Sequence, residues 1–452
     1  LTLWPLESIH LNSHLDSELE ANGDIAYVYL YTIVALFILV IACINFVNLA
    51  TARSAKRARE VGLRKVMGAH RSMLIKQFLT ESLLYAVFSS LLAVVLVQAI
   101  LPWFNDFAQK SLSFDFMANG FLVIMVVGIT LITGFVAGSY PAFYLSAFEP
   151  VDTLKGEAKS GKSQFTLRSF LVVSQFTISI VLLIGVGVVR DQLNYVKTQD
   201  LGFDDHRVLV LPTSDEMVAN YESVKTTLLQ NPGITGVSLS SRVPSGRLLD
   251  SQGARAEVGD EMKQINFRIA DVHTDHDFLK TLNIPVVAGR DFDASKASDS
   301  TEAFIINEAA VTAIGWNSND QAIGKKFNYG GQDGYITGVV KDFHFESLHQ
   351  EIAPVVFLIT KGRSRNLVVK LAPDQVDATM SFLQEQWAYL RPGYPFSSYF
   401  LDVRFDEQYA NEDRLAQLVS YFSILAILIG MLGLFGLASF TAEQRFKEIG
   451  IR

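Results

Sequence analysis

The chain has 452 residues, half of them hydrophobic, and its mean hydropathy is +0.26. This length and hydropathy exclude both a single ordinary domain and an ordinary soluble protein. The formal net charge is −8, but residues 191–414 alone hold 32 acidic and 21 basic residues, so the rest of the chain is net positive.

Five runs without Asp, Glu, Lys or Arg predict membrane-spanning helices. Each run has at least the ~20 residues that a helix needs to cross a bilayer core of roughly 30 Å. In chain order, the runs are residues 25–52, 82–105, 116–148, 169–189 and 415–442. The predicted fold is therefore a multi-pass α-helical membrane protein, in which residues 191–414 form a large separate domain.

Residues 1–24 contain no Lys or Arg and are expected to be the tail of a first extracytoplasmic domain. In the first span, Asn45 and Asn48 share one helix face, and we expect them to bond to another helix. In the third span, Gly134 and Gly138 are expected to let another helix approach closely.

A basic segment, residues 53–81, joins the first two spans, and we call it the elbow. It carries eight Lys and Arg residues against two Glu residues, which predicts a cytoplasmic location by the positive-inside rule. Apolar residues at helical spacing predict a helix that lies on an apolar surface and is broken at Gly68 and Ala69. Ser72 is expected to cap the next helix. Glu81 is interpreted as a headgroup-level or interhelical carboxylate, with proton carriage as the alternative.

Residues 149–168 are expected to be a cytoplasmic linker, and they contain a phosphate-loop pattern. The pattern G-x-x-x-x-G-K-[ST] is formed by Gly156, Gly161, Lys162 and Ser163. A working phosphate loop needs a buried strand before it and a helix packed on a sheet after it. Predicted spans lie on both sides here, so we interpret the match as false and the linker as a solvated basic segment that touches lipid headgroups or a partner.

Residues 191–414 are predicted to form an α+β domain outside the membrane, because strand-like and helix-like runs alternate irregularly. Expected helices are 221–229, 277–282, 308–314 after an Asn307 cap, and 373–390. Expected strands are 208–211, 236–239, 265–270, 303–306, 335–340, 354–359, 367–371 and 398–403.

Two groups of possible metal ligands occur in this domain, and both are interpreted as structural. One group is judged a structural or solvated loop, and the other a surface turn without the HExxH spacing of a zinc site. The first consists of Asp271, His273, Asp275, His276 and Asp277, and the second of His344, Glu346, His349 and Glu351. The elbow is basic, but its place between two spans argues against nucleic acid as a partner.

The elbow pattern returns at the end of the chain, which indicates two copies of one membrane unit. Residues 57–64, RAREVGLR, align with residues 445–452, RFKEIGIR, at an offset of 388. Residues 443–452 are thus expected to begin a second, truncated elbow after the span 415–442, whose Gly430, Gly433 and Gly436 suit close helix packing. The chain is expected to be a fragment of a longer protein.

Several motifs closely resemble the FtsX and MacB-type ABC transporter permeases. In the elbow they are Glu60-Val-Gly62-Leu-Arg64 with Gly68, and then Gln77-Phe-Leu-Thr-Glu81; after the third span, they are Gly138-Ser-Tyr-Pro141 through Lys155. Within residues 277–343, several stretches are similar to the MacB-type periplasmic core domain.

The resemblance implies a permease without catalytic residues, metal or cofactor of its own, in the cell inner membrane. A separate or fused ABC ATPase would bind ATP and Mg and grip the elbow, and the two tandem units would pair within one chain. A periplasmic adaptor or lipoprotein is a further candidate partner. The implied coupling residues are Arg57, Glu60, Gly62, Arg64, Gly68, Glu448, Gly450 and Arg452.

Two other functions remain open at this stage. One is an FtsX-like regulator that switches a cell-wall hydrolase rather than moving cargo. The other is a membrane sensor whose outer domain binds a ligand without any ATPase. The spans lack a charged path for an ion, which favours force transmission over conduction.

Overall fold

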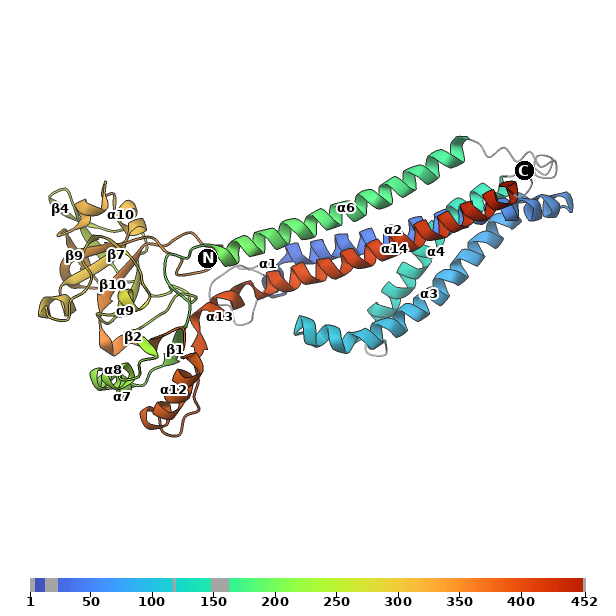
Figure 1. The fold of residues 1–452 in the computed structure, drawn as a ribbon. Coiled ribbons are helices and arrows are strands. Elements are labelled where there is room, and N and C mark those ends of the chain that lie inside the picture. Colours follow the sequence, from blue (N-terminus) through green and yellow to red (C-terminus); the bar gives the residue numbers. More distant parts are fainter. Residues whose placement is uncertain (1–4, 13–22, 117–118, 148–161, 450–452) are drawn as a thin grey trace. The chain divides into compact units, whose positions relative to one another are not determined.

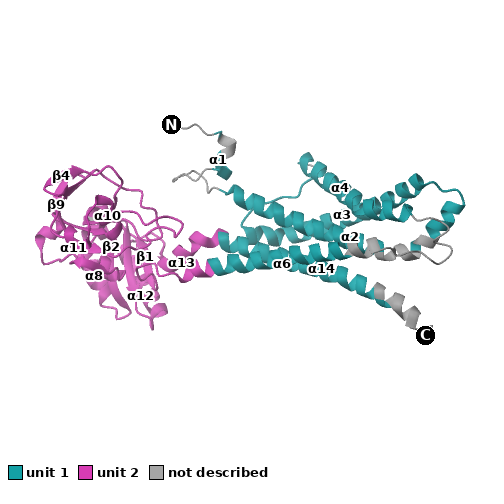
Figure 2. Ribbon diagram, turned by 90° about the horizontal axis from the view of Figure 1, so that it is seen from above, with its two compact units in different colours: residues 1–192, 412–452 teal, residues 193–411 magenta. Residues whose placement is uncertain are grey.

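A computed structural model of the chain describes residues 5–12, 23–116, 119–147 and 162–449 (Figure 1). The chain divides into two compact units (Figure 2). The first, which we call the membrane unit, consists of Leu1–Gln192 and Glu412–Arg452, and the second, the polar domain, of Leu193–Asn411.

Long helices make up the membrane unit. Five described helices are long and apolar enough to cross a membrane, as the charge-free runs predict. They are α2 (Ile25–Val66), α3 (Arg71–Ala108), α4 (Gly120–Ser146), α6 (Lys162–Thr198) and α14 (Ala410–Ile449), and a short helix, α1 (Leu6–Asn12), precedes them.

The candidate span Ile25–Thr51 agrees with the predicted run 25–52, and its helix α2 continues through the first half of the elbow to Val66. Two other helix boundaries differ from the prediction. The prediction that Ser72 caps the next helix is wrong, since α3 begins at Arg71, one residue after its N-cap residue His70. The third span is shorter than 116–148, because the side chain of Asn119 accepts a hydrogen bond from the Phe121 N–H at the start of α4.

Small residues bring α3 and α4 together, as the sequence predicts. A Cβ atom placed on Gly138 would lie 2.6 Å from Cβ of Ser82, and one on Gly134 would lie 3.0 Å from Cβ of Ala86. These separations are too short for two side chains, so the two glycines permit the contact.

Helices α2, α6 and α14 also pack closely, around polar as well as apolar side chains. Val34, Ile41, Leu182 and Ala426 form a buried apolar cluster. Nδ2 of Asn45 donates to the carbonyl oxygen of Ile429, which confirms that Asn45 bonds across to another helix.

Glycines of α14 face polar side chains at this contact. The carboxamide of Asn45 lies directly on Gly433, where any Cβ would collide with it. A Cβ on Gly430 would lie 2.9 Å from Nε2 of Gln175 on α6. The glycines thus leave room for buried amide groups, as close packing in membranes requires.

The polar domain is built on a twelve-stranded mixed sheet with the order β12-β1-β11-β2-β5-β10-β7-β9-β8-β3-β4, in which β6 pairs with β9. Two pairs, β5 with β10 and β7 with β9, are parallel and the rest are antiparallel. The strands are β1 (Val208–Pro212), β2 (Ile234–Ser240), β3 (Ala254–Val258), β4 (Glu261–Gln264), β5 (Ala270–Thr274), β6 (Val286–Gly289), β7 (Ala303–Asn307), β8 (Lys326–Tyr329), β9 (Gln332–Val340), β10 (Val355–Ile359), β11 (Asn366–Leu371) and β12 (Tyr399–Phe400).

Short helices accompany the sheet, which gives the α+β class that the sequence predicts. Alternate residues of one strand enter different cores, since Val208 and Val210 pack in one cluster while Leu209 and Leu211 pack in another. The helices are α7 (Asp215–Ala219), α8 (Tyr221–Leu229), α9 (Phe278–Thr281), α10 (Glu308–Ile314), α11 (Asn319–Ala322), α12 (Val376–Leu390) and α13 (Leu401–Asp406), with 3₁₀ turns at Ala297–Ser300, Lys361–Arg363 and Glu407–Tyr409.

Most predicted elements of the polar domain are present, and two predicted strands are wrong. The Asn307 cap is confirmed, since its side chain accepts from the Ala310 N–H. The strand predicted at 265–270 lies instead at Ala270–Thr274, and most of 398–403 is the helix α13. Strands β3, β4, β6 and β8 were not predicted, because they are short and three of them carry charged residues.

Substitution of Gly433 by Ala is expected to destabilise the membrane unit by about 1–3 kcal/mol, because the new Cβ displaces the Asn45 carboxamide and its interhelical hydrogen bond. Thermal unfolding of the detergent-solubilised protein measures the loss. In an Asn45→Ala background the same change is expected to cost less, and equal costs in both backgrounds would refute the coupling. Gly185→Ala on α6 is the matched control, since a Cβ there meets nothing within 4 Å.

Candidate functional site

The elbow is a helical hairpin whose turn is fixed by backbone hydrogen bonds. Gly68 has φ +98°, a left-handed conformation that favours glycine. Its N–H donates to the carbonyl oxygen of Lys65, and the Ala69 N–H donates to that of Arg64, both at 3.0 Å. This is the Schellman arrangement that ends helices, so the predicted break at Gly68 and Ala69 is confirmed.

An ion pair ties the two arms of the hairpin together. The Arg57 guanidinium donates to both carboxylate oxygens of Glu81, at 2.8 and 2.7 Å, and lies 6.0 Å from the ring centre of Phe78. These hydrogen bonds raise the pKa of Arg57 above its already high ordinary value, so the guanidinium stays charged. Glu81 is therefore an interhelical carboxylate, the first of the two interpretations.

Two further basic residues of the elbow bind the end of α4. Nζ of Lys65 donates to the carbonyl oxygen of Ser146 at 2.7 Å, and Nε of Arg71 lies 3.5 Å from the Ser146 hydroxyl. Cations at a helix C-terminus are stabilised by its unpaired carbonyl groups. The elbow, which consists of the end of α2 and the start of α3, thus also binds α4.

The predicted coupling residues fall into three environments. Glu60 and Arg64 pair with each other on the exposed side at 2.6 Å, and Arg64 also donates to Gln77 at 2.7 Å. Gly62 is buried next to Val61, which packs on Leu74 of α3 and Leu145 of α4. Arg57 and Arg64, seven residues apart on α2, thus both bond to α3, one through Glu81 and the other through Gln77.

The remaining predicted site residues are not described in enough detail to be placed. Gly450 and Arg452 lie outside the described residues, and Glu448 is helical but its side chain is not described. Gly156 and Gly161 of the phosphate-loop pattern also lie outside them, while Lys162 and Ser163 begin α6.

Sequence reasoning did not identify three contacts that hold the elbow. Ser146 was not singled out at all, and neither Lys65 nor Gln77 was given a role. Arg57 and Glu81 are 24 residues apart, and only the hairpin brings them together. An unmatched carboxylate at the edge of a predicted span was the one available signal.

One face of the elbow is apolar and exposed. Val66 and Met67 are 61% and 75% exposed, and Leu63 and Met73 are also exposed. The elbow helix is confirmed, and it packs on α3 and α4 through Val61, while Leu63, Val66 and Met67 lie on its exposed face.

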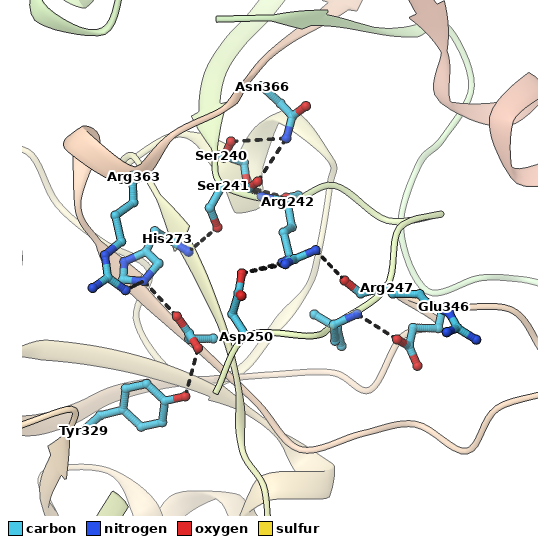
Figure 3. Close-up of polar contacts among 12 residues, drawn as sticks. Ser240, Ser241, Arg242, Arg247, Asp250, His273, Tyr329, Glu346, Arg363 and Asn366 are labelled. Carbon is cyan, nitrogen blue, oxygen red and sulfur yellow. Dashed lines mark hydrogen bonds and ion pairs between the residues drawn. The ribbon is translucent and has the colours of Figure 1, made fainter. Parts of the chain in front are cut away.

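In the polar domain, the first group of possible metal ligands is structural: Asp271 and His273 lie in the buried strand β5, and Asp275, His276 and Asp277 follow directly after it. Figure 3 shows His273 beside Arg363, with its Nε2 2.8 Å from Oδ2 of Asp271 and 3.1 Å from Nη1 of Arg363. The Tyr329 hydroxyl donates to the other Asp271 oxygen at 3.1 Å. Burial alone would raise the pKa of Asp271, but the bonds from His273 and Tyr329 and the nearby charge of Arg363 hold that pKa below its ordinary value.

The second group lies in the loop before β10 and helps to hold another loop in place. Oε1 of Glu346 accepts from the Leu248 N–H at 2.7 Å, and Nε of Arg242 donates to Asp250 at 2.7 Å (Figure 3). Among the described residues, no group of three or more His, Cys, Asp or Glu is arranged to hold a metal ion. Both groups thus have a structural role in the polar domain.

Comparison with known proteins gives matches to two families over most of the chain. Residues 32–150 match the FtsX-like permease C-terminal family, and residues 169–385 match the MacB-like periplasmic core domain. These two segments contain the elbow with its helices and most of the polar domain.

Curated relatives match over a shorter stretch. The macrolide export ATP-binding/permease protein MacB of Bdellovibrio bacteriovorus is 32% identical over 124 residues, 27% of this chain and 18% of the relative. MacB of Campylobacter jejuni is 30% identical over 126 residues, 27% of this chain and 19% of the relative. The match thus spans less than a fifth of the length of either relative.

Among solved structures, the periplasmic region of MacB from Actinobacillus actinomycetemcomitans is 16% identical, with a TM-score of 0.33. The superposition covers 47% of this chain and 97% of that structure.

The stability of the polar domain is expected to fall as the pH rises through about 6. Burial raises the pKa of both Asp275 and Asp291 to about 6, whereas an unfolded Asp titrates near 3.9. The folded state therefore binds more protons between these values, which stabilises it at the lower pH. Groups with a lowered pKa, such as Asp271, lose their contribution only at still lower pH.

Asp275→Asn is expected to reduce this pH dependence. The amide can still accept from the Asp277 N–H, and it can donate to the Tyr221 hydroxyl, which also lies 3.2 Å from the carbonyl oxygen of Val237. Urea unfolding at pH 7.5 and 5.5, followed by the fluorescence of Trp316 and Trp387 with Trp4 and Trp103 replaced by Phe, measures it. Asp374→Asn, at an exposed position, is the control. If the difference in unfolding free energy between the two pH values were unchanged in Asp275→Asn, Asp275 would not be a source of the pH dependence.

Proposed function

The chain belongs to the FtsX/MacB-type ABC transporter permeases, and we propose that it is a permease subunit that couples ATP hydrolysis by a partner ATPase to movement of its extracytoplasmic domain. The partner binds ATP and Mg, and this chain supplies no catalytic group. The transported cargo is a lipoprotein, a peptide or a drug, which is exported or extracted from the outer leaflet. The permease lies in the cell inner membrane, with the polar domain in the periplasm.

The elbow carries this proposal, because its two faces have different properties. On its inner face, the α2 arm is bonded to α3 through Glu81 and to α4 through Ser146. Its outer face presents the exposed side chains of Val66 and Met67. An apolar helix face of this kind suits a groove on a partner protein. A partner that pulls on it would move three helices together rather than one.

Helical continuity supports the transmission of such a movement. Helix α2 runs without interruption from Ile25 to Val66, and α6 and α14 are likewise continuous where the chain passes between the two units. The span sequences contain no charged path that would suit an ion channel. Force transmission therefore fits these helices better than conduction does.

Loss of the exposed apolar face is expected to uncouple the permease from its ATPase. In the full-length protein, the double substitution Val66→Asp and Met67→Asp is expected to lower capture of the ATPase by about tenfold or more, because carboxylates would enter an apolar groove. Co-purification followed by ATPase assay measures this. Leu112→Asp, which changes an exposed leucine in the loop between α3 and α4, is the matched control.

The outcomes separate the candidate functions. If wild-type protein never captures an ATPase, the permease proposal fails and a sensor is favoured. If it captures an ATPase, and the polar domain retains a cell-wall hydrolase without any transport, the regulator is favoured.

The proposed orientation predicts which side each unit faces. In a Cys43→Ser background, a cysteine at the exposed position Ser300 of the polar domain is expected to react with a membrane-impermeant thiol reagent in intact spheroplasts. A cysteine at the exposed position Ser72 of the elbow is expected to react only after lysis. The reverse pattern would overturn the orientation.

A further inference from the structure

A cavity of about 230 Å³ opens between α2, α3 and α4 beside the elbow. Arg57 and Glu81 line it together with the aromatic side chains of Phe46, Phe78 and Tyr85. Charge-free sequence ends just before the elbow and resumes just after Glu81. The cavity therefore lies where the membrane core gives way to the headgroup layer.

The charges of the described lining are balanced and open to approach. Among the residues whose side chains the structure describes, Arg57 and Glu81 are the formally charged ones that line the cavity, and their side chains are 41% and 32% exposed. A ligand that carries one negative and one positive group could bind both residues and leave no charge unpaired. An anionic ligand would instead meet the Glu81 carboxylate, at the cost of like-charge repulsion.

The volume argues for a small polar group rather than a drug-sized cargo. Drug-sized ligands occupy pockets of roughly 300–1,000 Å³, which is larger than this cavity. A water molecule fills about 30 Å³ of liquid, so the cavity holds considerably more than one or two ordered waters. A phospholipid headgroup lies between these limits and is supplied by the surrounding membrane.

We infer that this cavity binds the zwitterionic headgroup of an aminophospholipid, with its phosphate on Arg57 and its primary ammonium on Glu81. A guanidinium binds phosphate through paired hydrogen bonds, and a primary ammonium donates three hydrogen bonds, which a carboxylate can accept. Ser82 and Tyr85, which both carry a hydroxyl group, line the same cavity. The headgroup exchanges one ion pair within the protein for two with the lipid. The inference depends on the membrane spans and not on the export function.

Phosphatidylcholine provides the sharpest comparison, because its trimethylammonium group has no N–H to donate. The full-length protein is reconstituted in nanodiscs that contain phosphatidylethanolamine, phosphatidylcholine or phosphatidylglycerol, and retained lipids are counted by native mass spectrometry. Wild-type protein is expected to retain phosphatidylethanolamine about tenfold better than either other lipid. Equal retention of phosphatidylcholine would show aromatic binding of a quaternary ammonium instead and would overturn the inference.

Two variants test the site itself. Glu81→Gln keeps the shape of the side chain but removes its charge, and the preference for phosphatidylethanolamine over phosphatidylcholine is expected to fall to within about twofold. Ala50→Phe leaves both charges in place and fills the cavity, which Ala50 lines, so lipid retention is expected to be lost. Retention that survives in Ala50→Phe would place the lipid elsewhere and refute the site.

Matched controls separate this result from misfolding and from the proposed function. Arg64→Gln removes the ion pair with Glu60 and the guanidinium bond to Gln77, all three residues lying outside the cavity lining, and is expected to leave the lipid preference unchanged; a change here would overturn the site. Thermal unfolding verifies that each variant is folded. ATPase capture is measured on the same preparations, so a lipid preference without capture supports the cavity while the permease proposal fails.

Discussion

The structure depends on one constraint, that the hydrocarbon core of a membrane does not accept unpaired charge. The spans contain no charged residues, and the basic residues lie in the elbow instead. There, close to the membrane edge, two of these cations have partners. Arg57 bonds to Glu81, and Lys65 bonds to the carbonyl oxygen of Ser146. The same contacts that satisfy these charges also fasten α2 to α3 and α4. The contacts that these charges make therefore also hold the three helices together.

The internal repeat has a counterpart in helix packing. The offset of 388 residues pairs Asn45 with Gly433, and these two residues are in direct contact between α2 and α14. The two positions differ chemically, however, because only a glycine leaves room for the amide of the other. At this position of the repeat, one helix therefore supplies an amide side chain and the other supplies a glycine.

Sequence reasoning identified the features that depend on neighbours along the chain. Charge-free runs predict the spans because the membrane core sets their length, and the Asn307 cap follows from hydrogen bonds within one helical turn. The Ser72 cap was wrong because the turn at Gly68 lets α3 begin at Arg71. Strand β5 was misplaced because its polar residues Asp271 and His273 indicate a solvated loop. Their hydrogen-bond partners Tyr329 and Arg363 lie far away in sequence, so the sequence does not show that these residues can be buried.

Burial of charge has a different role in each unit. In the polar domain, Asp271 is only 1% exposed and is bonded to His273 and Tyr329. These bonds offset the free energy that burial of its charge costs. In the elbow, Arg57 and Glu81 remain partly exposed beside a cavity, so solvent, lipid or a partner can compete for them. A fully buried pair would resist rearrangement, because separating its members leaves an uncompensated charge. The partly exposed pair can exchange partners at lower cost, and such a contact suits an element that has to hold three helices together and still move.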